Sequence, residues 1–180
     1  MCRDKGFTLH EIRFYTGVPQ ASEAPFWNAF WSAKLLAMSH MDIRTFSRPL
    51  RYRKKTFRLR DGIEFSTRVG EEKGIDIRIA IDVLRMARKN QLDVAVLFSQ
   101  DQDFSEVADE VRDVAREVGR WIKIVSTFPD SATASNRRGI NKTDWVRIDR
   151  PVYDSCLDPH VTIVRSHKHP SPPKRNGRWL

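Results

Sequence analysis

The middle of the chain alternates between two hydrophobic periodicities, and this alternation limits the possible folds more than any other feature. Residues 92–98 (LDVAVLF) form a short apolar run with almost no alternation, which predicts a strand covered on both faces. Residues 104–119 repeat valine at helical spacing and end in Gly119, so we expect an amphipathic helix. A helix over 71–91 and a strand over 120–127 complete the pattern. The order helix, strand, helix, strand predicts parallel βαβ units and an α/β fold.

Two strands and a helix are expected before this region. Residues 9–17 alternate and end in glycine, which predicts a strand followed by a turn. Residues 21–41 predict a helix, with Ser22 as a candidate cap and Pro25 tolerated in the first turn. Residues 41–47 predict a further short strand.

Two tryptophans, Trp27 and Trp31, lie on a wide apolar face of the first predicted helix. Such a pair would suit stacking on nucleic-acid bases. Ordinary core packing is favoured, because large aromatic residues at helical spacing supply much of the area that a core buries.

Residues 48–60 (RPLRYRKKTFRLR) carry seven basic residues and no acidic one, with Tyr52 and Phe57 between them. An Asp-Gly pair and residues 63–69 predict the turn and the returning strand of a β-hairpin. A charged run is often only a solvated surface. Here the unbroken sign and the interleaved aromatics make a surface that contacts phosphates an equally favoured interpretation. The candidate nucleic-acid-binding residues are Arg51, Arg53, Lys54, Lys55 and Arg58.

The composition narrows the choice of partner and compartment. The 180 residues suffice for one domain, and a net charge of +9 favours a polyanionic partner over none. No apolar run approaches the roughly 20 residues that span a bilayer, so we expect no membrane association. Cys2 and Cys156 make neither a disulfide framework nor a zinc site, so we expect a reducing, cytoplasmic location.

The rhythm of helices and strands is lost after Pro151. We expect one domain over residues 1–159 and a basic, Pro-rich, disordered tail over 160–180. His167 and His169 could bind a metal, but a flexible tail is favoured because nothing nearby supplies further ligands.

Two carboxylates, Asp101 and Asp103, follow the predicted buried strand, at the edge of an α/β sheet where ligand sites gather. Both have a structural alternative. Asp103 and Glu106 have the spacing of a helix capping box, and Asp101 can organise the turn through its side chain. Capping accounts for one acid well and for the second less well.

A metal site at this edge needs a third carboxylate, because Mg²⁺ and Mn²⁺ take hard oxygen ligands. Asp76, at the start of the preceding helix, is the candidate, although a negative charge there also stabilises the helix end. Asp82 is a weaker choice, since it lies more than one turn further on. Three acids would repel one another unless a cation or a shared proton neutralised them. With a divalent cation such a cluster can activate water for phosphodiester hydrolysis.

Four segments together resemble the NYN domains, the LabA-like branch of the PIN-like nuclease superfamily. They are IRFYTG (12–17), EKGIDIRIAID (72–82), LFSQDQDF (97–104) and the stretch 137–159. The resemblance implies a PIN-like three-layer α/β/α sandwich with a mostly parallel sheet, and RNA cleavage that depends on Mg²⁺ or Mn²⁺. It places catalytic and metal-binding roles on Asp76, Asp101 and Asp103, with Ser99 as a polar neighbour.

One departure from the family pattern is large. NYN domains usually open with an apolar strand that ends in an Asp-Gly-x-Asn motif, whose aspartate completes the acidic site. Here neither that strand nor its aspartate is visible, and Asp4 lies in a polar context that makes it a poor substitute. We therefore expect an N-terminally incomplete domain, a gap filled by another element, or a rearranged sheet.

Three functions follow from these observations. The first is a metal-dependent ribonuclease-like domain, and the second is a non-catalytic RNA-binding protein on a degenerate nuclease fold. The third is an interaction module whose sheet is completed by a second copy or a partner chain, in which case Trp27 and Trp31 would be partly exposed in the monomer.

Overall fold

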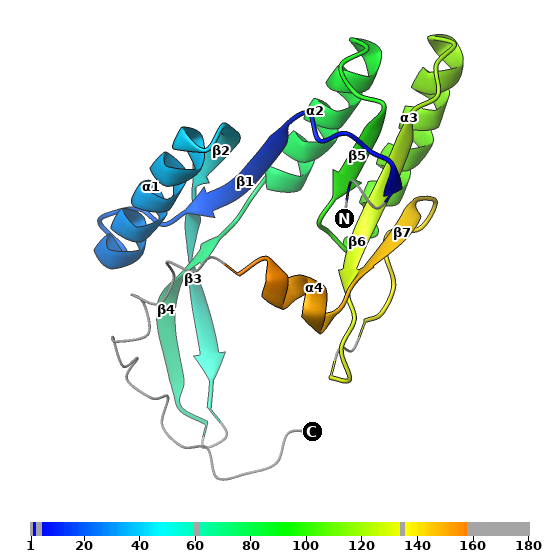
Figure 1. Cartoon of the computed structure of the whole chain (residues 1–180). Coiled ribbons are helices and arrows are strands. Elements are labelled where there is room, and N and C mark those ends of the chain that lie inside the picture. The colour runs from blue at the N-terminus through cyan, green and yellow to red at the C-terminus, as the bar shows by residue number, and fades with distance from the viewer. Residues whose placement is uncertain (1, 3–4, 60–61, 134–135, 158–180) are drawn as a thin grey trace.

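A computed structural model describes residues 2, 5–59, 62–133 and 136–157 (Figure 1). Helices alternate with strands in it, and the strands form both parallel and antiparallel pairs, so the α/β fold class is confirmed. The elements follow in the order β1 (Ile12–Val18), α1 (Pro25–His40), β2 (Ile43–Pro49), β3 (Arg51–Arg58), β4 (Glu64–Glu71), α2 (Ile75–Arg88), β5 (Val94–Leu97), α3 (Phe104–Glu117), β6 (Lys123–Pro129), β7 (Asp144–Ile148) and α4 (Arg150–Ser155).

The hydrophobic core lies where α2 and α3 pack against each other and against β5 and β6. α2 begins after Gly74, whose φ of 76° lies in the left-handed region that glycine adopts without steric cost. α3 buries the predicted valine stripe. The buried apolar side chains of this core are Val83, Ala87, Leu97, Phe104, Val107, Ala108, Val111, Val114, Ile122, Ile124 and Ile140.

The strands form three separate sheets. β1 pairs in parallel with β2, β3 pairs antiparallel with β4, and β5, β6 and β7 form a parallel sheet in that order. The parallel pairing of β5 with β6 confirms the predicted βαβ unit. The predicted three-layer sandwich around one mostly parallel sheet is not confirmed, because β1 and β5 belong to different sheets.

The half of the fold made of α1, β1 and β2 contains no fully buried residue. α1 is apolar on most sides, and among the described elements it packs mainly against the two-stranded sheet of β1 and β2, which is too narrow to cover it. Trp27 is 41% exposed, and Trp31 is half-buried with its ring 6.1 Å from that of Phe14. Core packing, the favoured interpretation of the two tryptophans, is therefore met in part by Trp31 and is wrong for Trp27.

The strand β5 is also less covered than expected. Only Leu97 is fully buried, whereas Val94, Ala95 and Val96 are half-buried. The helices cover one face of this sheet. Near its other face, Phe7 lines a small gap together with Val96 and Val125.

The predicted β-hairpin is confirmed, with a continuous register between β3 and β4. Two smaller expectations are wrong. Ala24 precedes the first turn of α1, so Ser22 is not its cap. The strand β7 and the short helix α4 lie in a region for which the sequence predicted no element. The proposed tail over 160–180, with His167 and His169, lies outside the described residues. Among the helices that are described, none has the length and apolar character needed to cross a bilayer.

Candidate active site at the carboxyl end of β5

The turn between β5 and α3 holds Asp101 and Asp103, and both side chains are exposed. The amide of Asp101 donates a hydrogen bond to Oγ of Ser99 at 3.1 Å. The amide of Asp103 donates to Oδ1 of Asp101 at 3.0 Å. Asp101 therefore organises the turn through its side chain, as one of the structural alternatives predicted.

The predicted capping role of Asp103 is wrong. Its backbone is already helical (φ −61°, ψ −26°), and its side chain accepts no hydrogen bond from the first turn of α3. The amides that a capping side chain would bind are used by the backbone instead: the amide of Ser105 donates to the carbonyl of Gln102 at 2.9 Å. The carboxylate of Asp103 is thus left facing solvent, without a partner among the described residues.

Two glutamines alternate with these acids and fix the turn to a neighbouring loop. Nε2 of Gln100 donates to the carbonyls of Asn136 and Arg138 at 3.2 and 2.9 Å. Nε2 of Gln102 donates to the carbonyl of Gly139 at 3.2 Å, and its Oε1 accepts from the amide of Asn141 at 3.0 Å. In this Gln-Asp-Gln-Asp sequence the amide side chains hold the loop, and the carboxylates stay exposed. Neither glutamine was predicted as part of the site, although their strict alternation with the acids was the signal.

The third predicted ligand, Asp76, lies exposed in the first turn of α2. Within the described ranges, no three Asp, Glu, His or Cys side chains lie together as a metal site requires. The carboxylate oxygens have the right chemistry for Mg²⁺ or Mn²⁺. In this structure, however, Asp76 does not join Asp101 and Asp103 in such a group. What the structure does show for Asp76 is a negative charge at a helix N-terminus, where it is favourable.

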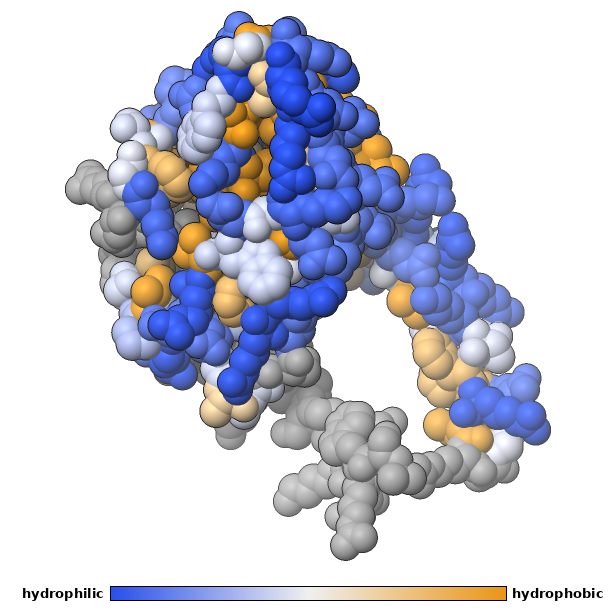
Figure 2. Space-filling view, turned by 90° about the vertical axis from the view of Figure 1, so that its right-hand side faces the viewer, coloured by the Kyte–Doolittle hydropathy of each residue, from blue (hydrophilic) through white to orange (hydrophobic). Residues whose placement is uncertain are grey.

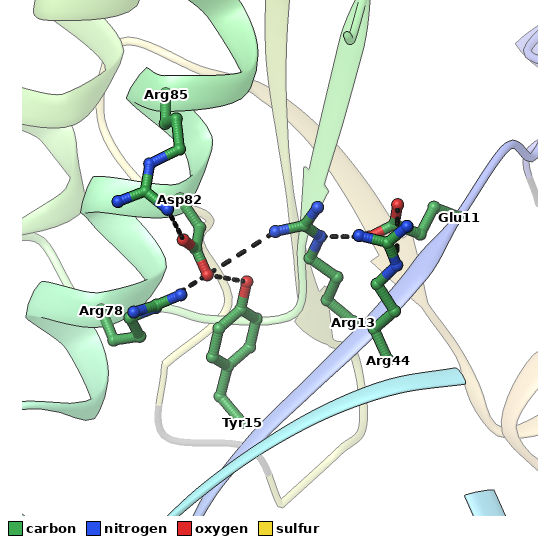
Figure 3. A network of polar contacts seen from close by, with 7 residues as sticks. All are labelled: Glu11, Arg13, Tyr15, Arg44, Arg78, Asp82 and Arg85. Carbon is green, nitrogen blue, oxygen red and sulfur yellow. Dashed lines mark hydrogen bonds and ion pairs between the residues drawn. The ribbon is translucent and has the colours of Figure 1, made fainter. Parts of the chain in front are cut away.

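Among the described residues, the buried carboxylate belongs instead to Asp82, which is 3% exposed (Figure 3). Its Oδ2 accepts hydrogen bonds from Nε of Arg78 and from the hydroxyl of Tyr15, both at 3.0 Å. Arg13 and Arg85 complete the surroundings, with nitrogens 3.6 and 4.0 Å from the carboxylate. A carboxylate that is enclosed by three guanidinium groups is not available to a metal.

The environment of Asp82 changes the pKa of two groups. Burial alone would raise the pKa of the Asp82 carboxyl, but the hydrogen bonds from Arg78 and Tyr15 and the charges of Arg78 and Arg13 lower it below its ordinary value. The pKa of Tyr15 is raised, first by burial and then by the adjacent Asp82. Asp82 therefore stays ionised and joins α2 to β1. Arg78 and Arg85, one turn before and after it, were the sequence signal for this role.

The predicted phosphate-binding residues all lie on β3. Nζ of Lys55 and Nε of Arg53 are 2.6 and 3.6 Å from the carboxylate of Glu71. Lys55, followed by the weaker influence of Arg53, lowers the pKa of Glu71. The other candidates form no ion pair within the described part of the chain, so they present free cations: Arg51, Lys54 and Arg58.

The comparison with protein families decides the identity of the fold. The profile of the NYN domain matches residues 4–138, three quarters of the chain. The chain belongs to the NYN family. The match covers the acidic turn, the glutamines and α2, and it ends inside the loop that Gln100 holds.

Two further comparisons add little to the NYN assignment. No curated protein matches the chain by sequence. Among solved structures, the ribokinase of Giardia lamblia is similar at 11% identity and a TM-score of 0.41. The alignment covers 75% of this chain and 41% of the ribokinase, so the NYN chain spans well under half of that protein. A likeness this weak carries no functional argument.

Proposed function

We propose that this NYN domain is a ribonuclease-like domain that hydrolyses RNA phosphodiester bonds at the acidic turn after β5. NYN domains are PIN-like nucleases as a family, which supports the reaction class. The observation that carries the proposal is the free carboxylate of Asp103 beside Asp101, on a turn that two glutamines hold in place. Such a preorganised turn costs little to order when substrate binds.

The two acids have different roles in the proposal. Asp103 is the carboxylate that is free to accept a proton from an attacking water, and Asp101 orients it by binding its amide. NYN and PIN-like nucleases generally use divalent metals, which supply Lewis-acid chemistry when bound. The ligand set of Asp76, Asp101 and Asp103 for Mg²⁺ or Mn²⁺ stays a prediction, as does the cytoplasmic location.

RNA is the proposed partner, and the strand β3 is its proposed phosphate-binding element. The free cations of Arg51, Lys54 and Arg58 are available to phosphates without first breaking an ion pair. Arg53 and Lys55 share Glu71, so each would exchange that carboxylate for a phosphate.

RNA cleavage tests the proposal. We expect the wild-type chain to cleave single-stranded RNA in the presence of Mn²⁺, and Asp101→Asn and Asp103→Asn to lower the rate by at least about 100-fold. Asp113→Asn, at an exposed acid on α3, is the matched control and should cleave as the wild type does. Equal rates in wild type and Asp103→Asn would remove the acidic turn from the reaction.

A second candidate function is favoured by the divided sheet. We propose that a strand from a partner chain, or from a second copy, pairs between β1 and β5 and completes a three-layer sandwich. The support is that each of these strands has a described neighbour on one side only, and that α1 buries none of its residues fully. Mass measurement during size-exclusion chromatography tests the second-copy form: a monomer at high concentration would exclude it and leave the partner chain.

A further inference from the structure

The hairpin of β3 and β4 extends away from the rest of the fold as a narrow arm (Figures 1 and 2). Its two strands pair with each other and with no other described strand. A two-stranded hairpin has no core of its own, so it normally keeps large apolar side chains to a minimum. This arm does the opposite towards its far end.

Four large apolar residues gather there and remain in contact with water. Phe57 and Phe65 are directly opposite each other in the register and are 43% and 45% exposed. Their rings are stacked, with centroids 5.4 Å apart and planes 22° from parallel. Leu59 and Ile63 continue the pairing beyond them and are 47% and 59% exposed. Exposed apolar patches of this kind mark binding surfaces.

A purely structural role explains only part of this arrangement. A cross-strand aromatic pair stabilises a hairpin, and this accounts for the stacking of Phe57 on Phe65. It does not account for two further exposed aliphatic side chains beside the pair, nor for the charges that accompany it.

The charged side chains of the arm are mostly positive. Side chains alternate between the two faces of a strand, so Arg51, Arg53 and Lys55 share the face of Phe57. The opposite face carries Lys54, Arg58 and Arg68. Among the described residues of the two strands, the acids are Glu64 and Glu71. The stacked rings therefore lie at the end of a row of cations that begins beside β2.

We propose that Phe57 and Phe65 form a platform on which unpaired bases of a nucleic acid stack, while the basic residues of the arm bind its phosphates. The proposal rests on the proposed function for the kind of nucleic acid, and it adds a contact remote from the acidic turn. Bases stack well on aromatic side chains, and only a strand without a paired partner offers its base faces.

Charge decides against the other occupants of this surface. Two hairpins of two copies would bring two strongly basic surfaces together. An anionic membrane would suit a ring of cations around an apolar tip. Here the cations continue along the whole strand, from Arg51 to Arg58, as a strand of regularly spaced phosphates requires.

Fluorescence anisotropy with the full chain in EDTA, which prevents metal-dependent cleavage, tests the platform. The probes are a labelled 12-nucleotide oligoadenylate RNA and an RNA duplex of the same length. We expect the double variants F57L/F65L and F57A/F65A to bind the single strand about fivefold or more weakly than the wild type. F57Y/F65Y should restore the affinity, and the duplex affinity should not change.

Trp121→Ala is the matched control, because Trp121 is a 61% exposed aromatic residue just before β6, outside the arm, and lies beside Lys123. It should leave the affinity unchanged. Wild-type affinity in F57L/F65L would overturn the platform. An equal loss of affinity for the single strand and for the duplex would overturn it too, because it would reflect a disturbed hairpin and not lost stacking. The platform would also be overturned if the wild type bound phosphatidylserine vesicles and both double variants lost that binding but kept their affinity for RNA. The surface would then be one that binds membranes.

The same experiments separate this proposal from the nuclease proposal. RNA that is bound through Phe57 and Phe65 but never cleaved would reject the nuclease activity and leave the platform. Cleavage that depends on Asp103, with affinity independent of the two rings, would reject the platform alone.

Discussion

The hydroxyl of Tyr15 lies 3.0 Å from the carboxylate of Asp82 and donates a hydrogen bond to it, which joins β1 to α2. This contact matters because β1 has no strand partner on the side of β5 among the described residues. The polar cluster around Asp82 therefore holds the small sheet of β1 and β2 on the rest of the fold.

We expect Asp82→Ala to lower the free energy of unfolding by about 2–3 kcal/mol, because it removes a buried, charged acceptor of two hydrogen bonds and the counter-charge of partly exposed guanidinium groups. Tyr15→Phe removes one hydrogen bond and should cost about 1 kcal/mol. Urea unfolding followed by circular dichroism measures both. Asp113→Ala, at an exposed ion pair with Arg116, should change stability by less than about 1 kcal/mol. A loss as small in Asp82→Ala as in this control would contradict the anchoring role.

The lowered pKa of Asp82 makes the stability depend on pH in the acid range. The folded-state pKa lies below the unfolded value of about 3.9, so the stabilisation is complete above that value and is lost as pH falls through the folded pKa. We expect the wild type to lose stability below about pH 4. Asp82→Asn should be less stable at pH 7. Between pH 5 and pH 3 its free energy of unfolding should fall less steeply with pH, because about one carboxyl group fewer takes up a proton on unfolding. Parallel profiles for the two proteins would count against it.

The hydrogen bonds that join Gln102 to the neighbouring loop can be tested by one substitution. Gln102→Glu keeps the size of the side chain and its acceptor for the amide of Asn141, but places a negative oxygen against the carbonyls of Gln100 and Gly139. We expect a loss of about 1–3 kcal/mol in stability at pH 7. Gln91 is exposed, and its side chain forms no hydrogen bond with a described residue. Gln91→Glu should therefore leave the free energy of unfolding nearly unchanged. An unchanged unfolding midpoint in Gln102→Glu would mean that the loop is held by other contacts.

The different environments of the two acids predict different stability effects. Asp103→Ala should change stability by less than about 0.5 kcal/mol, because its side chain caps nothing. A true capping aspartate would cost about 1 kcal/mol. Asp101→Ala removes an acceptor for the amide of Asp103 and should cost about 1 kcal/mol. Thermal unfolding of the two variants side by side distinguishes these outcomes, and the reverse order would contradict the observed turn.

The free cations of β3 should appear in the salt dependence of RNA binding. Replacing Arg51, Lys54 and Arg58 by alanine should reduce the slope of log affinity against log salt by about 2, since each phosphate contact contributes about 0.7 for a single strand. The triple substitution of Arg88, Lys89 and Arg116 removes the same charge from other elements and should leave the slope nearly unchanged. Equal slopes in the two triple variants would show that charge alone, and not the arm, governs binding.

Local patterns in the sequence were sufficient for the elements with strong periodicity. The valine stripe of α3 and the unbroken apolar run of β5 each act within a few residues, so the helix and the strand were predicted correctly, although β5 is less covered than its apolar run predicts. The Asp-Gly turn of the hairpin lies partly outside the described residues. β7 and α4 were missed because they have only five and six residues, and β7 carries charges at Asp144 and Arg147, which leaves too little for a hydrophobic pattern to stand out.

The candidate site was less predictable, because it depends on contacts between distant segments. The pairing of Gln102 with Gly139 spans 37 residues, and that of Tyr15 with Asp82 spans 67. The arginines one turn before and after Asp82 indicate an ion pair, but they do not show that Asp82 is buried while Asp76, on the same helix, is exposed. For Asp103 the capping spacing was present in the sequence, but the helix begins with backbone hydrogen bonds that make the cap unnecessary.

The isolated pairing of β3 with β4 has a consequence for the motions of the molecule. Among the described residues, hydrogen bonds near Phe57 are supported by one neighbouring strand and by no packed layer, so we expect this part of the arm to open at a smaller free-energy cost than α2 or α3. Its backbone amides should therefore exchange with deuterium while the helices remain protected. An occupant that stacks on the two rings would slow that exchange, and the arm would report its own binding event.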